Sequence, residues 1–170
     1  MNLKKNNQVQ LNKYYWGNQY EFETGVAGSK EILYLGGDAY SAAAVYVKEG
    51  SGAWAVYYLC KDYLGSITHI VNSSGVLKQE LSYDAWGRLR NPANQALYAV
   101  GTEPTLFLGR GYTGHEHLTA FGLINMNARL YDPVIGRFLS PDPQLQDPYL
   151  SQNYNLSLIH ISEPTRLRCI

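Results

Sequence analysis

Residues 110–143, RGYTGHEHLTAFGLINMNARLYDPVIGRFLSPDP, decide the fold of this 170-residue chain. Thr113 and Glu116 have the spacing of a capping box, in which each side chain accepts a hydrogen bond from the other residue's free backbone N–H. This pattern predicts one short helix near residues 114–121. Apolar and polar side chains alternate after that helix, which predicts a half-buried strand that runs through about Tyr131.

Aspartate and glycine recur three residues apart, at Asp62 and Gly65 and again at Asp84 and Gly87. An aspartate side chain can bind the free amides of the turn that follows it, while glycine adopts a positive φ, so the D-x-x-G pattern predicts a turn. Residues 131–137 form a third, stretched copy in which proline ends the preceding strand. The repeat therefore predicts strands that are separated by similar turns.

The segments between these turns predict β-hairpins. Residues 67–71 and 77–83 flank an Asn-Ser-Ser-Gly turn, and the second segment places Leu77, Leu81 and Tyr83 on one face. Residues 91–104 are polar and aperiodic, which predicts a surface loop.

Similar patterns occur nearer the N-terminus. Residues 14–23 predict two strands around a Gly-Asn turn, and residues 31–35 predict another strand. Residues 42–48 and 54–59 flank a glycine-rich connection of hairpin length. A helix over residues 40–47 is the alternative, because alanine permits it, but the Val-Tyr-Val run favours a strand.

Composition agrees with a sheet protein and argues against several functions. The chain has 15 Tyr against four Phe, and tyrosine suits sheet faces that are partly wet. The 14 basic and 14 acidic residues are spread along the chain, which disfavours a nucleic-acid interface. No apolar run reaches the length of a membrane span, and the polar start lacks an export signal. Cys60 and Cys169 are the only cysteines, so we expect no disulfide framework and a reduced core thiol at Cys60.

The motif-bearing residues together resemble the Rhs/YD-repeat family, whose members include large bacterial polymorphic toxins. The resemblance is carried by residues 83–88, 111–116, 126–133, 136–138 and 142–143. It implies that the hairpins are strips of one spiralling sheet around a hollow shell, closed at one end by the repeat-associated core segment. The expected fold class is therefore all-β, with antiparallel YD-repeat hairpins and the one short helix. A repeat buries its apolar face only by stacking on its neighbours.

We expect five segments in the chain. They are a polar N-terminal segment (1–13), divergent repeat strands (14–57), YD-repeat hairpins (58–109), the core segment (110–155) and a tail (156–170). The tail begins with LSLIHISEPTR, which resembles a translated sequencing adaptor, so we expect it to be non-native, like a fusion scar, and the chain to be a fragment. A genuine amphipathic strand is the alternative for the tail.

The resemblance implies a structural function, the encapsulation and delivery of a C-terminal toxin in interbacterial competition. The expected partners are the remainder of the shell and the toxin cargo, without nucleic acid or a membrane span. The full-length protein is expected to be secreted or at the cell surface. Unpaired strand edges also predict self-association of the fragment.

The resemblance also implies an alternative function, an aspartyl-type autoprotease that releases the toxin. The candidate catalytic residues are Asp142, Arg137 and Asp132, because two nearby carboxylates can share a proton while an arginine keeps one ionised. The assignment of roles between the two aspartates stays open, and a turn-pinning Arg–Asp bridge is the structural alternative. The family's downstream cleavage motif is missing, so we expect no self-cleavage of this chain.

Three other patterns carry less weight. Residues 109–114 match G-x-G-x-x-G, but the predicted helix is too short for a dinucleotide-binding βαβ unit. His115 and His117 lack the i, i+4 spacing that places two imidazoles on one helix face, so neither a metal nor a cofactor is expected. Carbohydrate binding by exposed tyrosines is compatible with the composition but has no supporting motif.

Overall fold

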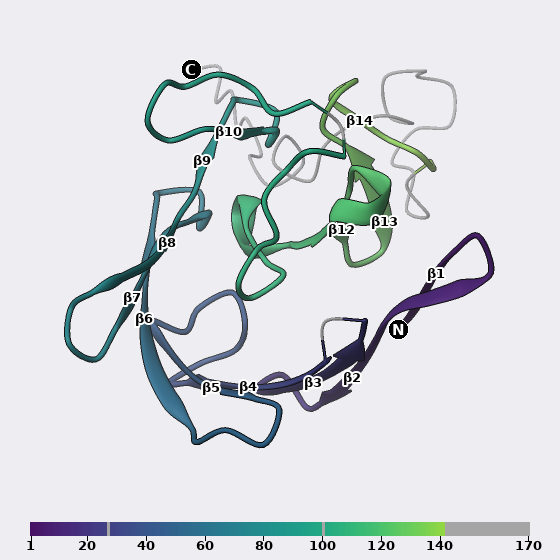
Figure 1. Cartoon of the computed structure of the whole chain (residues 1–170). Coiled ribbons are helices and arrows are strands. Elements are labelled where there is room, and N and C mark those ends of the chain that lie inside the picture. The colour runs from purple at the N-terminus through teal and green to yellow at the C-terminus, as the bar shows by residue number, and fades with distance from the viewer. Residues whose placement is uncertain (27, 100, 142–170) are drawn as a thin grey trace, which may run out of the picture.

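The computed structural model describes residues 1–26, 28–99 and 101–141, and antiparallel strands dominate it (Figure 1). Eight strands form one sheet in which sequence neighbours are spatial neighbours. They are β1 (Asn2–Lys5), β2 (Gln8–Trp16), β3 (Tyr20–Gly25), β4 (Gly28–Leu35), β5 (Ala44–Glu49), β6 (Ala55–Lys61), β7 (Ile67–Asn72) and β8 (Leu77–Glu80). The predicted all-β class of antiparallel hairpins is confirmed.

The later part of the chain lies on the concave side of this curved sheet (Figure 1). A two-stranded ladder joins β9 (Ser82–Tyr83) to β10 (Leu89–Arg90). A four-stranded sheet follows in the order β11 (Glu116–Leu118), β12 (Leu123–Met126), β13 (Arg129–Asp132) and β14 (Arg137–Phe138). The predicted surface loop at residues 91–104 contains no strand among its described residues.

The turns form as the D-x-x-G pattern predicts. One carboxylate oxygen of Asp62 accepts hydrogen bonds from the amides two and four residues later, at 3.0 and 2.8 Å. Asp84 repeats the arrangement at 2.9 and 2.9 Å, and the Asn72 side-chain oxygen repeats it at 3.0 and 2.8 Å. Gly65 and Gly87 have φ of 83° and 88°, which glycine adopts without steric cost. The repeat is thus a local turn in which asparagine can replace aspartate.

The predicted helix near residues 114–121 is replaced by two single 3₁₀ turns, η1 (Tyr112–Gly114) and η2 (Thr119–Phe121), with β11 between them. The capping box does not form, since Thr113 has a φ of 49° and its hydroxyl donates to the Tyr112 carbonyl. The Glu116 carboxylate binds Lys13 instead, at 2.8 Å. A distant charge therefore overrides the local helix signal.

The strand predicted to run through Tyr131 is a hairpin, β12 and β13. Its connection contains Asn127, whose φ of 61° is left-handed, a conformation that asparagine tolerates better than most residues. Leu77 also departs from expectation, because a bulge between β7 and β8 shifts the register and leaves it 50% exposed while Leu81 is buried. Cys60 is exposed and free, so the prediction of a core thiol at this position is wrong.

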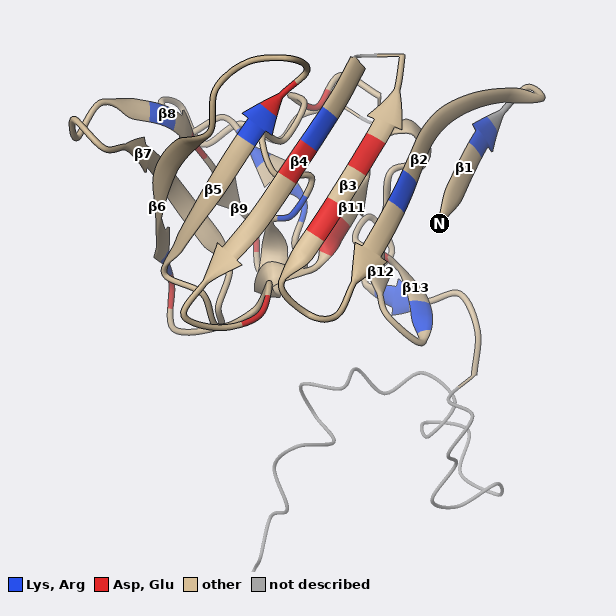
Figure 2. Cartoon of the chain, turned by 90° about the horizontal axis from the view of Figure 1, so that it is seen from below, with Lys and Arg blue, Asp and Glu red and all other residues tan. Residues whose placement is uncertain are grey.

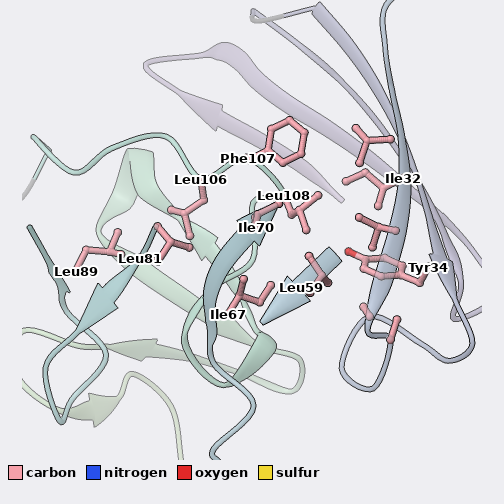
Figure 3. Packing of buried hydrophobic residues seen from close by; sticks show 14 residues of the cluster. Ile32, Tyr34, Leu59, Ile67, Ile70, Leu81, Leu89, Leu106, Phe107 and Leu108 are labelled. Carbon is pink, nitrogen blue, oxygen red and sulfur yellow. The ribbon is translucent and has the colours of Figure 1, made fainter. Parts of the chain in front are cut away.

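The main core lies between the concave sheet face and residues 105–120, which cover that face and which we call the covering segment. Ile32, Val45, Ile67 and Ile70 line that face and are fully buried. Leu108 reaches them from the covering segment and belongs to the same hydrophobic cluster, which Figure 3 shows. Burial of each such side chain contributes about 1.5–3 kcal/mol. The covering segment is therefore part of the core rather than an appendage.

Candidate functional site

Five charged side chains meet where the covering segment crosses β2 and β3, and we call them the charge cluster. Its members are Lys13 of β2, Glu21 and Glu23 of β3, Arg110, and Glu116 of β11. Figure 2 shows acidic positions of β3 beside a basic position of β2. Four of the five side chains are buried, which is unusual for charged residues.

Lys13 is at the centre of the charge cluster. Its ammonium lies 2.7 Å from Glu21, 2.8 Å from Glu23 and 2.8 Å from Glu116. The side chain is 2% exposed, and burial alone would lower its pKa, but the three carboxylates raise the pKa of Lys13 well above its ordinary value. Lys13 therefore remains charged and holds three carboxylates in place.

Arg110 supplies the second cation. Its Nε and Nη2 donate to one oxygen of Glu21 at 3.1 and 2.6 Å, and its Nη1 donates to the Gly114 carbonyl at 3.1 Å. The guanidinium carbon also lies 5.3 Å from the centre of the Tyr40 ring. Arg110 thus connects β3 to the loop that leads into β11.

Glu116 links the cluster to the four-stranded sheet. One of its oxygens accepts from the Tyr15 hydroxyl at 2.8 Å, and the other accepts from the Asn125 amide at 3.1 Å. Burial acts to raise the pKa of Glu116, but Lys13 and Arg110 outweigh it and lower the pKa below its ordinary value. The carboxylate is therefore ionised at neutral pH and joins residues about a hundred positions apart.

The arrangement suits structural fastening better than catalysis. Two cations face three carboxylates, and each close contact joins the sheet to the covering segment or one strand to the next. Among the described residues no group of three or more His, Cys, Asp or Glu side chains could hold a metal ion. The charge cluster fixes the covering segment against the sheet.

The structure brings two of the three predicted catalytic residues together. Asp132 and Arg137 are register partners in the β13–β14 pair. The Asp132 carboxylate accepts from the amides of Val134 and Ile135 at 2.8 and 3.3 Å, so it caps the turn between these strands. Asp142 lies outside the described residues, and the catalytic role of all three stays a prediction.

The two histidines that flank Glu116 occupy separate hydrogen-bonding positions. The His117 Nε2 atom accepts from the Tyr112 amide at 3.0 Å, and burial lowers the pKa of His117 to about 4. His115 Nδ1 lies 2.7 Å from the Thr113 hydroxyl, and burial, followed by the charge of Arg110, lowers its pKa. Both imidazoles are therefore neutral at physiological pH.

Sequence reasoning missed the charge cluster. Glu21 and Glu23 alternate with aromatic residues in the hairpin predicted for residues 14–23, whereas Lys13 lies just before it, in the segment predicted to be a polar N-terminal extension. Arg110 was noted only as part of a glycine-rich motif. Charged residues within a predicted strand were the available signal. The residues with which the strand residues pair lie about ninety to a hundred positions away in the sequence.

A curved antiparallel sheet, turns that are capped by Asp or Asn side chains, and a covering segment on the concave face are the features of a YD-repeat shell protein. A family model, the teneurin YD-shell, matches residues 50–163, more than half of the chain. The chain belongs to the teneurin YD-shell family. No helix of the described residues is both long and apolar enough to cross a membrane.

Individual relatives are much longer than this chain. Salivary gland surface protein 1 of Aedes aegypti is 35% identical over 95 residues, covering 55% of this chain and 3% of that protein. A TcdB2-TccC3 crystal structure without its hypervariable C-terminal region has a TM-score of 0.62 and 20% identity, covering 92% of this chain and 7% of that chain. A Photorhabdus luminescens Tc holotoxin pore has a TM-score of 0.57 and 19% identity, with 89% and 8% covered. This chain therefore spans only a small part of the length of these relatives.

Proposed function

We propose that this chain forms part of the wall of a hollow YD shell that encloses a C-terminal toxin and helps to deliver it. The supporting observation is the fastening of the covering segment to the concave sheet face by the charge cluster. A wall that excludes solvent from a cargo requires its inner parts to be held in one position.

The strand pairing supports a wall element as well. Among the described residues, β1 pairs with β2 alone and β8 with β7 alone in the eight-stranded sheet. Their outer backbone groups are available to adjoining strands of a larger sheet, or to other copies of the chain. The expected partners are the remainder of the shell and its cargo.

Two of the similar structures support a C-terminal position of the cargo. One of them is described as lacking a hypervariable C-terminal region, and another as a Tc holotoxin pore. By analogy, we place the cargo C-terminal to the wall and the full-length protein outside the producing cell. Interbacterial competition is the role that the resemblance to polymorphic toxins adds.

An autoproteolytic end of the same shell is the second proposal, with Asp142 as the leading carboxylate. The register pairing of Asp132 with Arg137 supports it, because the pair positions a carboxylate and a guanidinium in the strands that directly precede Asp142. Self-cleavage after the core segment would separate the cargo from the wall while leaving it enclosed.

One experiment tests both proposals on the full-length reading frame. Electrophoresis should show two fragments for the natural protein and one for Asp142→Asn, while Asp147→Asn, which alters the next Asp-Pro pair, should still be cleaved. Brief protease treatment should spare the cargo in all three proteins. Rapid cargo digestion would contradict encapsulation, and unchanged cleavage of Asp142→Asn would contradict the catalytic role alone.

A further inference from the structure

A hollow of about 670 Å³ lies beside the charge cluster, between the ends of β2 to β5 and the covering segment. Its volume is in the range of small-molecule sites, which are commonly about 300–1,000 Å³. Its apolar lining comes from β1 and β2 and from the covering segment. These side chains are Leu3, Leu11, Leu106, Phe107, Leu118 and Ala120.

The covering segment is held firmly where it borders the hollow. Gln79 of β8 donates to the Thr105 carbonyl at 2.9 Å and accepts from the Phe107 amide at 2.7 Å. Lys30 of β4 donates to the Phe107 carbonyl at 2.6 Å. Three contacts from two strands therefore fix this loop, so this part of the border is already in place before any ligand binds.

Two ammonium groups lie near one aromatic ring of the lining. The Nζ atoms of Lys30 and Lys78 are each 4.8 Å from the centre of the Phe107 ring. Lys30 has a carboxylate nearby, since its ammonium is 3.7 Å from Glu49. Lys78 forms no ion pair with any carboxylate of the residues that the structure describes, and it is exposed.

The remaining charges of the lining are compensated within the protein. Glu23 is paired with Lys13 at 2.8 Å, and His117 is neutral because burial lowers its pKa to about 4. The charge of Lys78 is left without a counterpart in the hollow. A ligand that complements this lining has one negative charge and an apolar body.

We propose that this hollow binds an aliphatic monocarboxylate, with Lys78 pairing with the carboxylate and the leucines of the lining contacting the hydrocarbon chain. A small molecule fits these observations better than a peptide strand, because the site is concave and the loop at residues 105–107 on its border is held by Gln79 and Lys30. The proposal does not depend on a toxin cargo.

Calorimetric titration of the whole chain with decanoate tests the proposal, with decanol as the neutral probe of equal length. Decanoate should bind saturably at one site, and decanol should bind about tenfold more weakly, because a charge-assisted hydrogen bond is lost. Equal affinity for the two probes, or no saturable heat with decanoate, would overturn the assignment.

A matched pair of variants locates the site. Lys78→Met keeps the aliphatic stem, removes the charge and should weaken decanoate binding about tenfold while leaving decanol unchanged. Lys48→Met removes one charge beside Glu31 and should leave both affinities unchanged. Circular dichroism should show the natural fold for both variants. An equal loss in the two variants, or no loss in Lys78→Met, would exclude Lys78 as the carboxylate partner.

Discussion

Replacement of Lys13 by methionine should strongly destabilise the chain. The side chain is 2% exposed and its ammonium contacts three carboxylates within 2.8 Å, so the variant leaves these carboxylates with Arg110 as the remaining cation of the charge cluster. Methionine has a similar shape, which keeps the loss of packing small. Removing one partner from a buried ion pair costs about 3–5 kcal/mol, and we expect Lys13→Met to fall in that range.

Urea unfolding followed by tryptophan fluorescence measures this cost. With an m-value of about 2 kcal/mol/M, the midpoint should fall by about 1.5–2.5 M. Lys48→Met is the matched control, because its 3.0 Å pair with Glu31 is partly exposed and such pairs contribute about 0–1 kcal/mol. Its midpoint should fall by less than about 0.5 M.

A second substitution examines the mechanism. Among the described residues, Lys13 is the cation that forms an ion pair with Glu23. Lys13→Met therefore leaves the Glu23 carboxylate without a cation. Adding Glu23→Gln should then recover part of the lost stability, although Glu23→Gln alone should destabilise the chain. Equal midpoint shifts for Lys13→Met and Lys48→Met, or strict additivity in the double variant, would refute the charge cluster as the fastening of the covering segment.

Two further predictions concern residues around the covering segment. The pKa of His117 is lowered from 6.5 to about 4, so the unfolded chain binds more protons between these values, and this contribution to stability should be lost as pH falls from about 6.5 to 4. Melting temperatures of His117→Gln should depend less on pH in this window, and equal pH dependence would contradict the assignment. Gly87→Ala should cost at least about 2 kcal/mol more than Gly75→Ala in urea unfolding, because both have positive φ but only at Gly87 would a Cβ lie 2.6 Å from the Tyr112 ring. Similar free-energy costs for the two substitutions would contradict this prediction, because they would show that the Tyr112 ring moves freely to make room for the added Cβ.

The local features of the fold were predictable from the sequence. Asp62 and Asp84 bind amides two and four residues away, so the information that specifies each turn lies within five residues. Hairpins between such turns follow from alternation, because side chains of a strand point to opposite faces. The turn at Asn72 was predicted as a glycine-containing turn. Its equivalence to the aspartate turns could be recognised only from the structure.

Predictions failed where a local signal competed with a distant partner. Thr113 and Glu116 have capping-box spacing, but Glu116 gains more from Lys13 and Tyr15 than from a backbone amide three residues away. The continuous alternation before Tyr131 concealed a two-residue turn at Asn127, because asparagine enters the left-handed region without a glycine to mark it.

The sequence by itself determined the antiparallel hairpins, the turn positions and the resemblance to YD-repeat proteins, since each depends on residues close together in the chain. Only the tertiary structure decided which face of the N-terminal hairpin is inside and which charges meet there. Lys13 and Glu116 are about a hundred residues apart, and their 2.8 Å contact exists because the sheet curves around the covering segment. Burial in that curve turns ordinary charged residues into the charge cluster.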